Sequence, residues 1–144
     1  MSTNLLKDTK ITRVEASATA GQTTLTTDTL DMKEFDGCTF IAALGDVTDT
    51  AVVTLTIQTG DASDGSDAAD TGIIATFTAG ASDADSKLLV AEIVRPLKRY
   101  VTATLDRGTA NAVVDGIFAI QTDPTRKPTT QSSDVIASDF GLGD

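Results

Sequence analysis

The sequence predicts an all-β protein: an antiparallel β-sandwich, for which a jelly-roll topology is favoured. Three observations lead to this prediction. Short segments rich in Val, Ile and Thr recur along the chain, separated by clusters of Gly, Asp, Asn and Ser that favour turns. Several segments alternate apolar and polar residues with a period of two, as half-buried strands do. Eight or nine such segments can be counted, close to the eight strands of a jelly roll.

The expected strands follow one another with turn signals between them. The clearest is 51–59, where Val53, Leu55 and Ile57 face one side. The segment 87–94 has helical propensity, but Pro96 and its length of eight residues favour a strand. Turns are expected at Asp36-Gly37 and at Gly45-Asp46. In chain order, the expected strands cover 11–20, 23–32, 38–44, 51–59, 72–79, 87–94, 100–105 and 112–121.

The segment 93–121 is expected to organise the sandwich. Val101, Ala103 and Leu105 point to one side of a strand, and residues 106–111 (DRGTAN) have the composition of a turn. The chain then returns through a second strand at 112–121, rich in β-branched residues. We therefore expect a hairpin at the centre of the sandwich.

Both ends of the chain are expected to leave the domain, which covers residues 11–122. Residues 1–10 are polar enough for an extended N-terminal arm. Residues 123–144 are expected to form an extended C-terminal tail, because they contain two prolines and a run of Thr, Ser and Gln. The tail holds four apolar residues that either pack back on the domain or dock on a neighbouring molecule: Val135, Ile136, Phe140 and Leu142.

The composition argues against enzymatic and nucleic-acid-binding roles. The 144 residues suffice for one domain, the net charge of −10 repels nucleic acid, and no apolar run is long enough to span a membrane. The chain has no histidine, so the usual general base and metal ligand are missing, and we expect no enzyme and no cofactor. The single cysteine, Cys38, is expected in the core.

The acidic loop after residue 60 presents an aspartate at every third position. Such a spacing could gather oxygen ligands around a calcium ion, but it does not match the EF-hand loop. A solvated loop is the favoured interpretation, and ion binding stays open for Asp61, Asp64, Asp67 and Asp70.

Much of the chain's positive charge lies around the expected hairpin. The residues are Arg95, Lys98, Arg99 and Arg107. One interpretation is that they neutralise acidic loops of the same domain. The other is that they face an acidic partner or a neighbouring copy, through salt-sensitive pairs with carboxylates.

The run RPLKRYVTATLDRGTANAVVDGIFAIQTDPTRKPTTQ resembles a group of small virion proteins of tailed bacteriophages. In that group an RPxKRYV segment leads into a strand, an RGTANAVV turn follows, and a Pro-Thr-Gln tail closes the chain. The resemblance is densest over residues 93–131, about a quarter of the sequence. It is a pattern of residues and not a catalytic motif.

The resemblance implies a head decoration (cement) protein: a β-sandwich that binds the outer surface of the assembled phage head and stabilises it. It further implies the major capsid protein as partner, a homo-oligomer with a trimer favoured, and a location in the host cytoplasm before assembly. The basic residues and the apolar tail residues named above would be the candidate contacts with the capsid or between subunits. Two alternatives stay open: a neck, tail-tube or fibre-base component of the virion, and a carbohydrate-binding β-sandwich.

Overall fold

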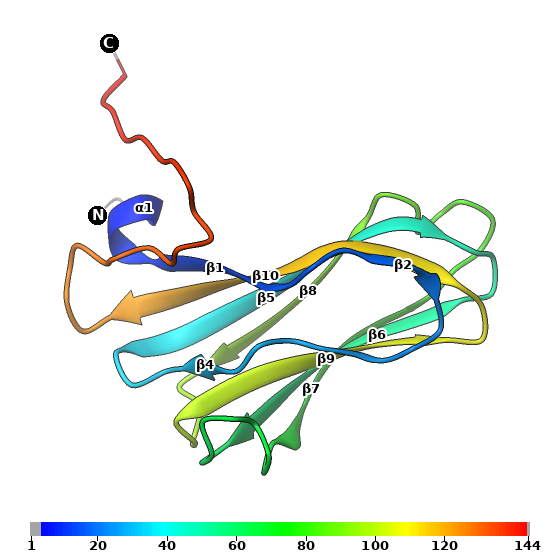
Figure 1. The fold of residues 1–144 in the computed structure, drawn as a ribbon, viewed down its shortest axis with the longest axis horizontal. Coiled ribbons are helices and arrows are strands. Elements are labelled where there is room, and N and C mark those ends of the chain that lie inside the picture. Colours follow the sequence, from blue (N-terminus) through cyan, green and yellow to red (C-terminus); the bar gives the residue numbers. More distant parts are fainter. Residues whose placement is uncertain (1–3, 144) are drawn as a thin grey trace.

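The computed structural model describes residues 4–143, and two antiparallel sheets packed face to face make up most of it (Figure 1). We call them the β10 sheet and the β9 sheet after their central strands. The β10 sheet contains, in spatial order, β1 (Lys10–Glu15), β10 (Ala112–Pro124), β5 (Phe35–Val47) and β8 (Leu88–Val94), with β2 (Ala18–Gly21) also paired to β10. The β9 sheet contains β3 (Leu25–Thr26), β9 (Tyr100–Gly108), β6 (Val52–Gly60) and β7 (Ala69–Thr78), with β4 (Leu30–Asp31) also paired to β9.

The strand order confirms the β-sandwich and its jelly-roll topology. β1 and β2 both pair with β10, so together they act as one interrupted strand, and β3 and β4 do the same along β9. The remaining order, β1-β10-β5-β8 in one sheet and β3-β9-β6-β7 in the other, is that of an eight-stranded jelly roll. The edges at the open side of the sandwich are β7 and β8.

The predicted central hairpin is wrong. β9 and β10 do occupy the centre of the fold, but each lies inside a different sheet, and β9 pairs with β6 while β10 pairs with β5. Both strands carry an apolar face, represented by Leu105 on β9 and Ile117 on β10, and both of these residues are fully buried. Two such faces enter the same core when the strands lie opposite each other across the sandwich, so the turn carries the chain from one sheet to the other.

Both turns predicted near residue 40 are also wrong, because Asp36-Gly37 and Gly45-Asp46 lie inside the 13-residue strand β5. Pairing on both sides, with β10 and with β8, outweighs the local turn preference. Gly37 leaves room for Thr122 Oγ1 on the neighbouring strand, which would have to move if this position carried a Cβ.

The N-terminal arm is not extended, since α1 (Leu5–Asp8) forms one helical turn capped by Asn4. Residues 1–3 of the predicted arm lie outside the described residues. Within residues 4–143, no helix is long and apolar enough to cross a membrane.

The C-terminal tail begins after Pro124 and first runs beside β1. Gln131 accepts a hydrogen bond from Ile11 N at 2.7 Å, and its Nε2 donates to Thr9 O at 2.7 Å and to Leu6 O at 2.9 Å. These bonds cover the outer edge of β1, which protects an otherwise unpaired strand edge. Beyond this point the tail projects away from the sandwich, above the β10 sheet in Figure 1.

Candidate docking surfaces

The structure divides the four predicted basic residues into different environments. Arg107 was predicted as a surface anchor, and this is wrong because only 4% of it is exposed. It lies at the far end of β9 from Arg99, eight residues along the chain. Its guanidinium is enclosed by the corner where the chain crosses between the sheets. Arg107 therefore belongs to the interior and to no docking surface.

The Arg107 guanidinium connects three stretches of backbone. Nη1 donates to Thr19 O and to Ala112 O, both at 2.8 Å, and Nε donates to Thr23 O at 2.9 Å. Nη2 donates to the Thr23 hydroxyl at 2.6 Å. No salt bridge to Arg107 is found within residues 4–143. Carbonyl oxygens thus replace a carboxylate as the partners of this buried charge.

The other three basic residues lie at or beside the exposed loop between β8 and β9. Lys98 Nζ pairs with Asp61 at 2.8 Å, and Arg99 makes a two-pronged contact with Asp31 at 2.7 and 2.9 Å. The hydrogen bond from Arg99 lowers the pKa of Asp31, and the bond to Asp61 raises the pKa of Lys98. These two cations neutralise carboxylates of the same domain, as the first interpretation of the basic residues holds.

Arg95 differs from its neighbours in the loop. It is exposed, and none of the salt bridges of the described chain involves it. Leu97, two residues later, is fully exposed. The tip of the loop therefore exposes one cation without a salt bridge and one apolar side chain within the described residues.

An apolar surface that sequence reasoning missed is the outer face of the β10 sheet. The pairing places Phe118, Ile41 and Val90 side by side across three strands. Ile120 follows beside Phe118 on β10, and Ile11 of β1 pairs with it. We call this surface the apolar face; its apolar residues, none of them fully buried, are Ile11, Ile41, Ala43, Leu88, Val90, Val94, Phe118 and Ile120. Three polar residues share the face: Arg13, which lies over the Phe118 ring, and the hydrogen-bonded pair Thr39 and Glu92.

The outer face of the β9 sheet has the opposite character. Thr54 and Thr76 pair across β6 and β7 and share a hydrogen bond between their hydroxyls at 2.8 Å. Thr56 and Thr104 are paired across β6 and β9, and Ile74, which pairs with Thr56, is an exposed apolar residue among these threonines. A sheet with one face in a core and the other in water normally has this polar outer face. The β10 sheet departs from that rule, so its outer face is suited to being covered.

The signal for the apolar face is visible in the sequence. Strands of the β9 sheet alternate, as in VVTLTIQT (52–59), whereas strands of the β10 sheet read FIAAL (40–44) and IFAI (117–120) without alternation. Continuous apolar runs are typical of strands covered on both faces.

The apolar residues of the tail do not pack into the core. Ile136 is 96% exposed and Leu142 is 85% exposed. Phe140 is 48% exposed, with Lys7 Nζ 4.6 Å from the centre of its ring, and Val135 is half-buried. Ile136 and Leu142 thus do not pack back on the domain, which was one of the two predicted alternatives.

Each of the four aspartates of the acidic loop has a hydrogen-bond partner within the domain, and Asp61 pairs with Lys98 as described above. Asp67 accepts from the backbone N–H groups of Asp61 and Ala62, which lowers its pKa, and Asp64 accepts from Ser66 N. Asp70 accepts from Gln58 at 2.7 Å. No group of three or more His, Cys, Asp or Glu residues suited to a metal ion occurs within residues 4–143.

Cys38 is fully buried, in agreement with its predicted place in the core. Burial raises the pKa of its thiol to about 12. The thiolate that a nucleophile needs is therefore strongly disfavoured.

Comparisons with known proteins give little further information. No protein-family model matches the chain, and no curated protein matches it. Among solved structures, a chain of the infectious bursal disease virus Gx strain structure is similar, with a TM-score of 0.47 and 14% identity. The alignment covers 85% of this chain and 35% of that chain, so this protein spans about a third of its length. A similarity at this level carries no argument, and the fold assignment depends on the observed strand order.

Proposed function

We propose that the chain is a structural protein of a tailed-phage virion, a decoration protein that docks on the outer surface of the head and stabilises it. The observation that carries the proposal is the contrast between the two sheets. One outer face is covered by threonines, and the other is the apolar face defined above. Contiguous apolar surface on a soluble domain marks an interaction site.

The apolar face would dock against the major capsid protein, and the loop tip would add a polar contact. Docking a rigid sheet loses little conformational entropy, which favours a binding role for a preformed sandwich. Arg95 would pair with a capsid carboxylate at the rim, where such pairs steer association and depend on salt. The resemblance of residues 93–131 to phage decoration proteins supports the same function.

Stabilisation of the head follows from mass action. A protein that binds the assembled shell better than its free subunits shifts the equilibrium toward the shell by its binding free energy. With many copies on one particle, a modest binding free energy per copy adds up to a large stabilisation of the head.

The test is co-sedimentation of the purified chain with DNA-filled, expanded heads of the phage that encodes it, with unexpanded shells as control. We expect saturable binding to the expanded heads at hundreds of copies per particle. Binding at about a dozen copies would instead indicate a neck or tail component. No binding to either shell would refute the decoration function.

A further inference from the structure

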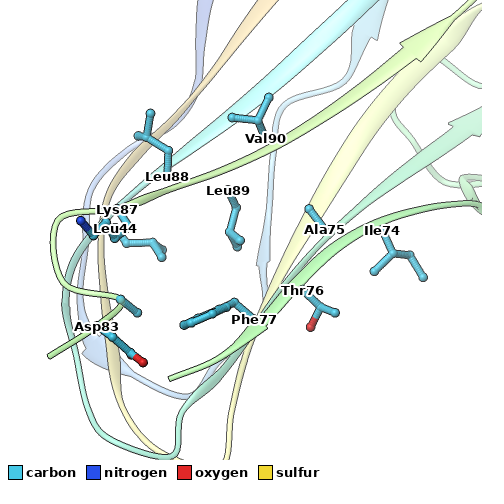
Figure 2. A pocket seen from close by; sticks show the side chains of 11 residues that line it. Leu44, Ile74, Ala75, Thr76, Phe77, Asp83, Lys87, Leu88, Leu89 and Val90 are labelled. Carbon is cyan, nitrogen blue, oxygen red and sulfur yellow. The ribbon is translucent and has the colours of Figure 1, made fainter. Parts of the chain in front are cut away.

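The open side of the sandwich carries a second apolar feature, a groove between the edge strands β7 and β8. It has a volume of about 560 Å³, and Phe77 and Leu89 point into it from opposite sheets (Figure 2). Ile74 on β7 and Leu88 on β8 border it and are mostly exposed. We call it the β7–β8 groove.

Both strands beside this groove have an unprotected edge. β7 and β8 end the β9 sheet and the β10 sheet respectively, so along each of them one row of N–H and C=O groups has no neighbouring strand. The edge of β1, at the other end of the β10 sheet, is covered by the tail. An unpaired edge beside an apolar groove is the usual receptor for an extended peptide, which adds a strand and inserts alternate side chains.

The chain also contains a peptide of this kind. Residues 135–143 form neither helix nor strand and expose Ile136, Phe140 and Leu142. The segment carries a single charged side chain, Asp139. The groove is lined by one residue of each charge, Lys87 and Asp83. The segment therefore complements the groove by its hydrophobicity.

We infer that the β7–β8 groove binds the C-terminal segment 135–143 of a second copy of this chain. The lengths agree: nine extended residues span about 30 Å, and the seven residues of β8 span about 23 Å.

A chain's own tail fits this groove less well. It is fixed at β1 through Asp134 and Arg13 N (3.1 Å), three strand spacings or about 14 Å from β8. Crossing the sheet to reach β8 would use about four residues of the tail. The tail would then run across the strands and not along the edge of β8. A neighbouring copy can lay the whole segment along the edge.

The inference does not depend on capsid binding, and its test needs only the purified full-length chain. Sedimentation velocity over a wide concentration range should show a reversible oligomer. A tail variant, Ile136→Ser/Phe140→Ser/Leu142→Ser, should raise the dissociation constant at least about a hundredfold, because it removes three apolar side chains from the contact. A groove variant, Phe77→Thr, should weaken association in the same direction. The control Leu5→Ser changes an apolar residue outside both surfaces, with an exposure close to that of Phe140 and Phe77, and should leave association unchanged.

Mixing the two variants shows whether the tail binds the groove of another copy or the groove of its own chain. The tail variant keeps an intact groove, and the groove variant keeps an intact tail. A 1:1 mixture should therefore form a dimer although each variant alone is monomeric. A wild type that stays monomeric, an oligomer that the tail variant leaves unchanged, or a mixture that remains monomeric would each overturn the inference. Circular dichroism of every variant confirms that the sandwich is folded.

Discussion

Replacing Arg107 by methionine tests whether its buried guanidinium stabilises the fold. The substitution keeps an unbranched side chain of similar length and removes all four hydrogen bonds of the guanidinium. Thr19 and Thr23 are exposed, so water can replace the donor at their carbonyl oxygens. Ala112 is fully buried, and its carbonyl oxygen loses this donor where water is excluded.

The expected loss of stability follows from these environments. An unsatisfied buried acceptor costs about 1–3 kcal/mol, and hydrogen bonds to a charged group contribute about 1.5–3 kcal/mol each before the desolvation of that charge is subtracted. Part of this loss is offset because methionine, unlike Arg107, has no charge that must be desolvated in the folded state. We expect Arg107→Met to lower the free energy of unfolding by about 2–3 kcal/mol, or the melting temperature by roughly 4–9 °C. Arg107→Lys should not rescue it, since an ammonium group cannot reach all of these oxygens at once.

The assay is urea unfolding followed by far-ultraviolet circular dichroism. Arg95→Met is the matched control, because it removes an exposed arginine and should change stability by less than about 0.5 kcal/mol. If Arg107→Met were as stable as Arg95→Met, the buried hydrogen bonds of this guanidinium would not stabilise the corner.

Three further predictions concern the core, the tail and the basic loop. Cys38, with its thiol pKa near 12, should not react with a thiol reagent in the native protein at pH 8 and should react after unfolding; rapid native labelling would contradict its burial. Gln131→Ala removes the acceptor of Ile11 N–H, so hydrogen exchange at that amide should accelerate about five- to tenfold, and unchanged exchange would mean that the tail does not protect β1. The lowered pKa of Asp31 means that its pair with Arg99 stabilises the fold above pH 3.8 and loses this effect as the pH falls further. Asp31→Asn should therefore lower the melting temperature at pH 7, and a variant as stable as the wild type at that pH would argue against the pair.

The sequence predicts the strands well where one face of the sheet is exposed to solvent. Along β6, alternation separates Val53, Leu55 and Ile57 from their threonine neighbours, and all three are fully buried. The same rule could have placed Arg107, because it continues the inward series of Val101, Ala103 and Leu105 along β9. It was missed because an arginine is normally expected at the surface.

The connection between β9 and β10 could not be predicted from local signals. A turn of Gly, Thr and Asn has the same composition whether the chain pairs with itself or crosses to the opposite sheet. The choice depends on which strands lie beside β5 and β6, which are contacts distant in sequence. For the same reason the β7–β8 groove was not predicted, since its lining comes from both sheets.

The central claim, that the apolar face docks on the phage head, is tested most directly by quantitative co-sedimentation of a paired variant with expanded heads. Ile41→Thr/Ile120→Thr makes this face resemble the threonine-covered one and touches neither the groove nor the tail. The control, Thr54→Ser/Thr76→Ser, makes an equally small change on the opposite face. We expect the first variant to stay folded and to bind about a hundredfold more weakly, while the control binds like the wild type. Equal binding of both variants would show that the apolar face does not dock on the head.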